Sequence, residues 1–446
     1  MEENILRILI RQNPQWAKEK IVVPEVKRDL FYKIGKFMEP PQILAVTGLR
    51  RVGKTTIMKQ LMSEVLKSST RTENIMYASF DHRLMQSDKA LEDIIEYFLS
   101  TKAEDGRKFL FLDEIQKVDG WEQILKVYYD LGGIKFIISG SASLQIKKAK
   151  ESLSGRIMDF HLQPLNFREY LRFVGEDPKS DILEMPYEFD KLKKVHEENL
   201  LKKERIIGRF NDYLFKGAFP ELVETEDEEF IAAYINNSVI EKIIYQDIPE
   251  VFKVKREDLL YSLVEYCAKE TGKIFDITNL SNIFNADRNT VSKYLFYLEN
   301  GFLIKIAYNY SRSLSKQMRK NKKIHVIHPS VSIALSGYKK SVLRAEDIAG
   351  YYVESLCNSL LSTAGKVFFF RDPQKREVDF VVVKGGEIIP IEVKYRRYIN
   401  EKDIEGLRFF MEKFKCKSGI VLTKDTFKKE GSITYIPVWL FLLCVE

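Results

Sequence analysis

One short stretch constrains the fold of this chain more than any other. Gly48-Leu49-Arg50-Arg51-Val52-Gly53-Lys54-Thr55-Thr56 fits the phosphate-loop pattern G-x-x-x-x-G-K-[ST] without a substitution. The apolar run Ile43 to Thr47 before it predicts a buried parallel strand, and the run Ile57 to Met62 after it predicts the first turns of a helix. A strand, a glycine-rich loop and a helix in this order predict a site for a nucleoside triphosphate.

The chemistry of such a loop assigns roles to its residue types. Glycines let the backbone N–H groups turn inward around the phosphates, where the N-terminus of the following helix adds its positive dipole end. We expect Lys54 to reach the β- and γ-phosphates and the hydroxyl of Thr55 to ligate Mg²⁺. The predicted nucleotide-binding residues of the loop are Gly48, Arg51, Val52, Gly53, Lys54, Thr55 and Thr56.

A second motif delivers two carboxylates at the end of a buried strand. The apolar run Phe109 to Leu112 is followed by Asp113 and Glu114, and open α/β sheets place their sites at the C-terminal ends of their strands. We expect Asp113 to hold Mg²⁺, because a hard cation takes oxygen ligands, and Glu114 to polarise the attacking water. A solvated acidic strand end is the alternative.

Two more apolar runs predict strands of the same sheet. The run Ile75 to Phe80 predicts a strand inserted before the acidic one, and Lys135 to Ile138 predicts a strand that ends in small hydroxyl residues. In a sheet that brings this strand to the phosphate loop, Ser139 or Ser141 senses the γ-phosphate or the attacking water. Ordinary turn residues are the alternative.

Composition bounds the remaining choices. A chain of 446 residues, 45% of them hydrophobic, holds material for about two to four domains. Its 71 basic and 64 acidic residues give a net charge of +7, which permits a nucleic-acid partner without demanding one. We expect a cytoplasmic protein, because no apolar run approaches the roughly 18 residues of a membrane span and no secretory signal pattern is found. The four cysteines are far apart, which disfavours a disulfide framework and a zinc site.

These motifs, taken with the run Leu153 to Leu165, resemble the prokaryotic AAA-type ATPases. More narrowly, they are similar to a family of predicted archaeal and bacterial ATPases that carry a C-terminal domain of unknown function. In that family Leu-x-Gly-Arg, a short strand and Pro-Leu-x-Phe-x-Glu close the nucleotide domain, as Leu153 to Arg156 and Pro164 to Glu169 do here. The resemblance implies that Arg156 is an arginine finger or a sensor of the γ-phosphate. A surface arginine is the alternative.

The middle of the chain predicts helices followed by a compact DNA-binding fold. Residues 167 to 255 carry helical periodicity, which fits the helical lid that follows the nucleotide domain in AAA-type enzymes. Residues 258 to 307 predict three short helices and a strand, the outline of a winged helix. We expect Asp287 to Thr290 to meet base edges, with Lys293 and Tyr294 one turn further on; a protein-docking module is the alternative.

Basic residues crowd the segment after that strand, and we expect the segment to be exposed. Contact with phosphates beside the winged helix and a solvated connection are the two alternatives. The residues are Arg312, Lys316, Arg319, Lys320, Lys322 and Lys323.

The C-terminal part predicts a separate α/β unit. Glu392 and Lys394 share one strand face, since residues two apart in a strand point the same way. Asp379 on the preceding strand and Glu-x-Lys on this one resemble the PD-(D/E)XK nuclease core. The resemblance implies that Asp379 and Glu392 bind Mg²⁺, that Lys394 orients or deprotonates the attacking water, and that Glu354 supports the metal from a helix. A salt-bridged sheet or an inactive relative is the alternative.

Together these patterns predict an α/β protein with four parts. They are a P-loop NTPase sheet at 1–165, a helical lid at 166–255, a winged helix with a basic connection at 256–325, and a small nuclease-like α/β domain at 326–446, whose apolar run Pro437 to Leu443 predicts a final core strand. The predicted function is Mg²⁺-dependent ATP hydrolysis that controls a nuclease-like, DNA-interacting effector domain. A nucleotide-switched DNA-binding regulator or a scaffold protein without nuclease activity is the alternative. ATP and Mg²⁺ are the expected cofactors, double-stranded DNA and a second copy of the chain are candidate partners, and no membrane is expected.

Overall fold

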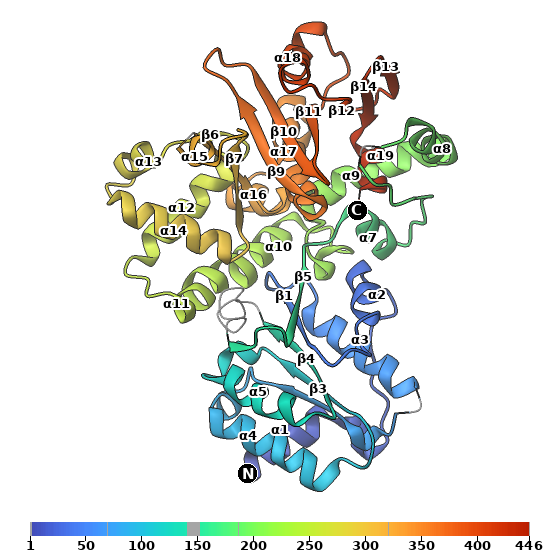
Figure 1. Cartoon of the computed structure of the whole chain (residues 1–446), viewed down its shortest axis with the longest axis vertical. Coiled ribbons are helices and arrows are strands. Elements are labelled where there is room, and N and C mark those ends of the chain that lie inside the picture. The colour runs from blue at the N-terminus through green and yellow to red at the C-terminus, as the bar shows by residue number, and fades with distance from the viewer. Residues whose placement is uncertain (1, 69, 141–151, 186, 320, 446) are drawn as a thin grey trace. The chain divides into compact units, whose positions relative to one another are not determined.

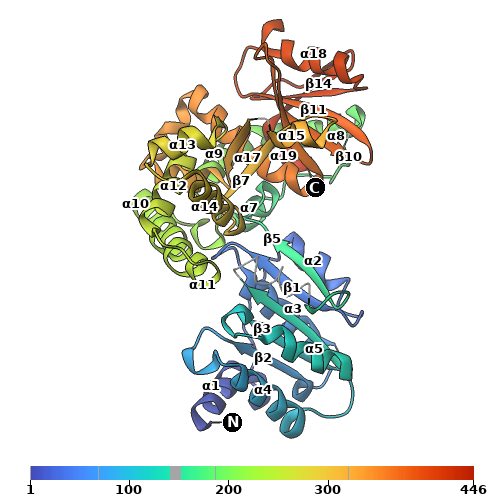
Figure 2. The same ribbon diagram turned by 60° about the vertical axis from the view of Figure 1, so that its left-hand side comes forward.

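The computed structural model describes residues 2–68, 70–140, 152–185, 187–319 and 321–445. It divides into two compact units, drawn in Figures 1 and 2. The first unit holds residues 1–163 together with 247–253, and the second holds residues 164–246 and 254–446.

The first unit is built on a parallel five-stranded sheet of order β2-β3-β4-β1-β5. Nearly every residue of β1 to β4 is buried, as expected for a parallel sheet with helices on both faces, whereas the edge strand β5 is only partly buried. The apolar runs therefore form the strands that their sequences predict. The strands are β1 (Ile43–Gly48), β2 (Ile75–Ser79), β3 (Lys108–Asp113), β4 (Ile134–Gly140) and β5 (Ile157–Leu162).

Helices cover both faces of this sheet (Figure 1). On one face, α1 (Glu3–Gln12), α4 (Asp88–Tyr97) and α5 (Trp121–Leu131) share a core with alternate strand residues. On the other face, α2 (Asp29–Gly35) contacts β5, and α3 (Lys54–Lys67) contacts β1, β3 and β4. The phosphate loop joins β1 to α3 and lies at the carboxyl edge of the sheet, beside the ends of β3 and β4.

The second unit contains a mixed sheet of order β13-β14-β12-β11-β10-β9-β7-β8-β6. The parallel pairing of β7 with β9 joins the strands of the predicted winged helix to those of the predicted nuclease-like domain. The strands are β6 (Ile274–Phe275), β7 (Ile304–Asn309), β8 (Lys322–Val326), β9 (Lys366–Arg371), β10 (Glu377–Lys384), β11 (Glu387–Lys394), β12 (Gly419–Thr423), β13 (Lys428–Glu430) and β14 (Ile433–Pro437).

Apolar helices cover the C-terminal strands on two sides. Helix α18 (Glu405–Phe414) packs its Leu407, Phe410 and Met411 into one core, while α17 (Glu346–Ala364) and α19 (Val438–Cys444) pack into another. In Figure 2, β14 and β11 lie between α18 above and α19 below.

The prediction of a final strand at Pro437 to Leu443 is wrong. Strand β14 ends at Pro437, and Val438–Cys444 form the helix α19. Every residue of this helix is buried. An apolar run that is buried on all sides has no polar face, so its periodicity cannot distinguish a helix from a strand.

Helices of residues 164–246, most of the region predicted as a helical lid, belong to the second unit. Aromatic side chains of α7 and α9 join the core that contains Trp439 of α19. The helices are α7 (Phe167–Phe173), α8 (Phe189–Asn199), α9 (Lys203–Lys216) and α10 (Glu228–Ala233), and π-helical turns follow α10 over Tyr234–Ile240 and Ile243–Asp247.

Three helices precede β7 in the order that a winged helix would give. They are α12 (Glu257–Lys269), α13 (Ile277–Ile283) and α14 (Arg288–Asn300), and β6, β8 and β7 form the adjoining strands. The expected base contact of Tyr294 is wrong, because this residue is buried. Its hydroxyl accepts hydrogen bonds from the backbone N–H groups of Lys255 (3.3 Å) and Arg256 (3.0 Å).

Among the helices in the described part of the chain, none is both long and apolar enough to span a bilayer.

Candidate nucleotide site

Backbone geometry shapes the phosphate loop. Gly53 precedes α3 with φ +99°, and Arg51 adopts φ +66°, a left-handed conformation that is uncommon outside glycine. A Cβ on Gly48, which has φ +151°, would lie 2.3 Å from the carbonyl oxygen of Leu162 on β5. The first glycine of the pattern therefore lies at the end of β1, where β5 leaves no room for a side chain.

Lys54 points back into the loop. Its ammonium donates to the carbonyl oxygens of Gly48 (3.2 Å) and Leu49 (3.1 Å), and the residue is buried. It begins α3, whose first N–H groups have no partner within the helix. A cation and a helix N-terminus thus converge where the motif predicts phosphates.

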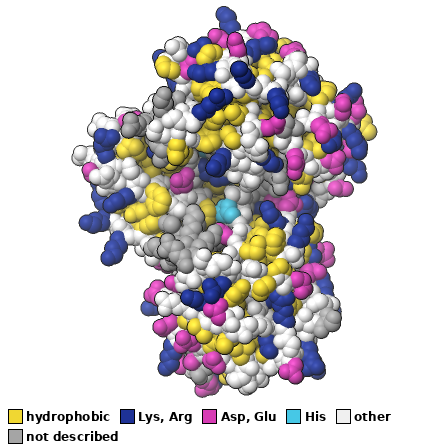
Figure 3. Space-filling model, viewed as in Figure 1, with side chains coloured by type: hydrophobic (Ala, Val, Ile, Leu, Met, Phe, Trp, Pro, Cys, Tyr) yellow, Lys and Arg dark blue, Asp and Glu magenta, His cyan; other side chains and the backbone are white. Residues whose placement is uncertain are grey.

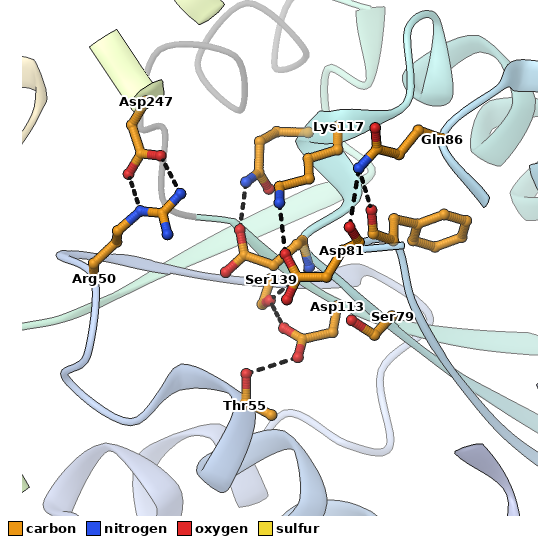
Figure 4. Close-up of polar contacts among 12 residues, drawn as sticks. Arg50, Thr55, Ser79, Asp81, Gln86, Asp113, Lys117, Ser139 and Asp247 are labelled. Atoms are coloured by element: carbon orange, nitrogen blue, oxygen red, sulfur yellow. Dashed lines mark hydrogen bonds and ion pairs between the residues drawn. The ribbon is translucent and has the colours of Figure 1, made fainter. Parts of the chain in front are cut away.

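Asp113 is held by hydroxyl groups from three elements, and Figure 4 shows two of these contacts, with Thr55 and Ser139. Thr55 and Tyr77 each donate to its Oδ2 at 2.7 Å, and Ser139 donates to its Oδ1. Burial raises the pKa of Tyr77 well above its ordinary value, with a further contribution from the charge of Asp113. The phenol therefore stays protonated and remains a hydrogen-bond donor to the carboxylate.

Glu114 follows Asp113 in a left-handed conformation, with φ +54° and ψ +39°. Its backbone N–H donates to Ser139 Oγ (3.1 Å), and its Oε2 accepts a hydrogen bond from the side-chain amide of Gln116. The strained turn directs the two neighbouring carboxylates differently, Asp113 toward Thr55 and Glu114 toward Gln116. Ser139 contacts both residues and thereby positions them. Its role in sensing the γ-phosphate stays a prediction, and Ser141 lies outside the described residues.

Arg28 stabilises the loop from outside the motif. Its guanidinium donates to the carbonyl oxygens of Val52 (2.8 Å) and Gln163 (2.9 Å), and it is buried. It thereby ties the loop to the end of β5. The sequence gives no local signal for this contact, because the partners are backbone carbonyls distant along the chain.

Arg50 of the loop forms an ion pair with a residue nearly two hundred positions away. Its Nε and Nη2 donate to the two carboxylate oxygens of Asp247 at 2.7 and 2.5 Å (Figure 4). Burial, and then the charge of Asp247, raises the pKa of the nearby Glu250. Segment 247–253, which includes α11 (Ile248–Val251), belongs to the first unit. The residues on either side of it along the chain belong to the second unit.

Arg156 is not brought to the phosphate loop of its own chain. It precedes β5 at the amino end of the parallel strands, where its carbonyl oxygen accepts from Ile43 N–H, and the loop lies at the carboxyl end. Its guanidinium pairs with both carboxylate oxygens of Asp130 at 2.8 and 3.1 Å. Its role as an arginine finger stays a prediction.

The nuclease-like residues lie close together in the second unit. Asp379 Oδ2 accepts from Val393 N–H (2.8 Å), and Lys394 Nζ lies 2.5 Å from Glu392 Oε1. Burial, and then the charge of Asp379, raises the pKa of Glu392. Lys323 is also present in this cluster, with its ammonium 3.0 Å from Glu354 Oε1. The expectation of an exposed basic segment is therefore wrong for Lys323, whose side chain is 3% exposed.

Basic residues of α14 face solvent. Arg288, Asn289 and Lys293 are exposed, and Asp287 caps the helix by accepting from the N–H groups of Asn289 and Thr290. On the face drawn in Figure 3, basic and acidic side chains are interspersed. That face shows no continuous basic stripe, and the side chains of Lys316, Arg319 and Lys320 lie outside the described residues.

The chemistry of the loop fits a nucleotide with Mg²⁺. Thr55 and Asp113 bring a hydroxyl and a carboxylate oxygen together at the carboxyl edge of the sheet, and both are ligands that a hard cation takes. Lys54 and the N-terminus of α3 supply positive charge beside them.

Comparisons with known proteins agree with this assignment for part of the chain. Residues 40–171 match the family described as an AAA domain. Residues 207–342 and 350–441 match two families that are described only as domains of unknown function. Fold, site and family match together define an AAA-type P-loop domain at the N-terminal end of the chain.

Two relatives match this chain in sequence along most of their length. An uncharacterized protein of Methanocaldococcus jannaschii is 26% identical over 431 residues, which cover 93% of this chain and 87% of the relative. An uncharacterized protein of Haemophilus influenzae is 25% identical over 389 residues, 85% of this chain and 89% of the relative. Among solved structures, a RuvB variant of Thermotoga maritima superposes with TM-score 0.28 at 14% identity, covering 71% of this chain and 96% of the other.

Proposed function

We propose that this chain binds and hydrolyses ATP with Mg²⁺, and that its nucleotide state controls the second unit. The observation that carries the proposal is the contact of Thr55 with Asp113 beside the buried Lys54, with Glu114 next in sequence. These residues supply a phosphate-binding cation, two oxygen ligands for Mg²⁺ and an acid that polarises water. Bound Mg²⁺ would neutralise charge on the phosphates.

Each residue of the site has a separate task. Lys54 and the N-terminus of α3 bind and orient the phosphates. Thr55 and Asp113 would hold the metal ion, and the hydroxyls of Tyr77 and Ser139 fix the direction of the Asp113 carboxylate. Glu114 accepts a hydrogen bond from the attacking water and orients it for in-line attack. Gln116, which donates to Glu114, positions that carboxylate.

Control of the second unit is supported by the pair of Arg50 and Asp247. Arg50 is a loop residue, and Asp247 ends the helical segment that continues from the second unit. A change in the loop on nucleotide binding or hydrolysis therefore acts directly on a segment that is covalently continuous with the second unit on both sides.

Measurements of nucleotide binding and of the steady-state ATPase rate test the proposal. Lys54→Ala abolishes nucleotide binding, whereas Glu114→Gln retains binding and lowers the hydrolysis rate by roughly 100-fold or more. Equal turnover by wild type and Glu114→Gln would remove Glu114 from this role. Repeating the assay with double-stranded DNA identifies DNA as a partner if the rate changes.

A nucleotide-switched DNA-binding regulator without nuclease activity is the second candidate. The exposed Arg288 and Lys293 on α14 favour DNA contact. The pairing of Lys394 with Glu392, rather than an open carboxylate pair, favours the absence of cleavage. Nucleotide binding without measurable hydrolysis would select this candidate.

A further inference from the structure

The acidic cluster of the second unit is centred on a lysine. Lys323 enters it from β8, and its ammonium lies 2.6 Å from Glu377 Oε1, 3.0 Å from Glu354 Oε1 and 3.7 Å from Asp379 Oδ1. The three carboxylates belong to α17 and β10. One cation therefore contacts three acids that come from two different elements.

Burial makes this cation necessary. The side chains of Glu354 and Asp379 are each 12% exposed, and that of Lys323 is 3% exposed. Buried carboxylates are strongly unfavourable unless a cation or hydrogen bonds compensate them. The remaining cations are peripheral: Arg371 lies 3.6 Å from Glu377 Oε2, and Lys394 pairs with Glu392.

The residues do not fit a divalent metal ion in this arrangement. A metal site needs several oxygen atoms that converge on one point at about 2.0–2.6 Å. Here an ammonium group occupies the point on which Glu354, Glu377 and Asp379 converge. With the side chains as they stand, no group of three or more His, Cys, Asp or Glu residues in the described part of the chain is placed to hold a metal ion.

One carboxylate oxygen at the edge of the cluster has no hydrogen-bond partner. Glu392 Oε2 is buried and unpaired, whereas Glu392 Oε1 contacts Lys394. The cluster thus retains one carboxylate oxygen, Glu392 Oε2, that would be available to a cation in the absence of the Lys323 ammonium.

We propose that Lys323 is the resident cation of this site and takes the place of the divalent ion that the nuclease-like pattern implies. The site is therefore closed to metal ions while β8 holds Lys323 in place. Removal of the ammonium opens a cation site formed by Glu354, Glu377 and Asp379.

This arrangement also assigns a structural link. Strand β8 pairs with β6 and β7, next to helices α12 to α14, while Glu354 and Asp379 belong to the C-terminal strands and α17. Lys323 thereby links β8, which adjoins the predicted winged helix, to α17 and β10 of the predicted nuclease-like domain. A metal ion gains access only when this contact is released.

Titration with Mn²⁺ followed by electron paramagnetic resonance tests the proposal. All samples are the full chain without nucleotide and carry Asp113→Asn, which removes the carboxylate expected to hold metal at the phosphate loop. Lys323→Ala is expected to bind one additional Mn²⁺ per chain, and Asp379→Asn in that background is expected to abolish it. Lys216→Ala is the matched control, because Lys216 is another buried lysine with a single carboxylate partner, Glu226.

Two results would overturn the proposal. The first is Mn²⁺ binding by the chain with Lys323 intact that Asp379→Asn abolishes, since a metal ion would then be resident. The second is a folded Lys323→Ala variant that binds no additional Mn²⁺. If Lys323→Ala fails to fold, the comparison of Lys323-containing chains with and without Asp379→Asn still decides, because the proposal requires identical Mn²⁺ titrations from the two.

Discussion

At the residue scale, Asp113 depends on hydroxyl groups that orient it. Ser139 contacts both the buried carboxylate of Asp113 and the backbone N–H of the half-buried Glu114, so its removal leaves two polar groups without this partner. Loss of a residue that orients a metal ligand typically costs 10- to 100-fold in metal affinity. Ser139→Ala should therefore raise the Mg²⁺ concentration needed for half-maximal ATPase activity by about 10-fold or more, as measured by metal titration of the steady-state rate.

A matched control separates this effect from general damage to the strand ends. Thr47 lies near the end of β1 and donates to Asp159 Oδ1 at 2.8 Å, away from Asp113. Thr47→Val should leave the Mg²⁺ requirement unchanged. Equal shifts in the two variants would mean that Ser139 acts only through stability.

Some residues of the site are predictable from sequence and others are not, for a physical reason. Lys54, Thr55, Asp113 and Ser139 sit at loop or strand ends that a short motif or apolar run marks. Tyr77 is a buried strand residue, and nothing in its local pattern distinguishes it from a core aromatic side chain. Arg28 and Asp247 contact the loop only through the fold, since their partners are remote in the chain.

At the element scale, the pair of Arg50 and Asp247 should transmit the nucleotide state to segment 247–253. Asp247 is 9% exposed in its side chain, so the pair is more than a surface contact. We expect ATP to change the amide hydrogen exchange of this segment in the wild type, and we expect Asp247→Asn to remove at least half of that change. Hydrogen exchange measured by mass spectrometry reports it.

The chain offers a control of the same geometry. Arg156 and Asp130 form another bidentate pair at the amino end of the strands. Asp130→Asn should leave the response of segment 247–253 to ATP intact. An undiminished response in Asp247→Asn would show that the pair is a static attachment.

Helix α14 makes a separate prediction about DNA. Arg288→Glu combined with Lys293→Glu should weaken DNA binding and flatten its dependence on salt, because fewer phosphate contacts release fewer counterions. Tyr294→Phe should leave DNA affinity unchanged, since its buried hydroxyl accepts a hydrogen bond from the backbone N–H of Arg256. Fluorescence anisotropy at several salt concentrations measures both effects. Absence of binding by the wild type at low salt would instead favour a protein-docking module.

Elements also show where sequence patterns fail. Strands β1 to β4 of the first unit are short apolar runs bounded by loops, and each forms as predicted. Helix α19 has the same apolar composition, and only its packing against α7, α8 and β14 determines its conformation. The prediction for Lys323 is wrong for another reason. A lysine in a basic segment predicts exposure, and only the fold shows that α17 and β10 place carboxylates around its ammonium.

At the scale of the whole molecule, the division into two units predicts which parts of the chain fold alone. Phe167, Tyr170, Phe210 and Tyr213 are fully or nearly fully buried in the core that contains Trp439. Burial of one large apolar side chain is worth about 1.5–3 kcal/mol. Four of them together are comparable with the roughly 5–15 kcal/mol that stabilises an entire domain.

A chain of residues 164–446 should therefore unfold cooperatively, whereas residues 256–446 should lack a cooperative transition. The shorter chain follows the predicted start of the winged helix and removes α7 and α9 from the core of the C-terminal sheet. Thermal melts followed by circular dichroism compare the two directly. If residues 256–446 melt cooperatively at the same temperature as residues 164–446, the helices of residues 164–246 contribute nothing to this core and act as an independent appendage. A lower or absent transition places them within the folding unit, because their aromatic side chains complete it.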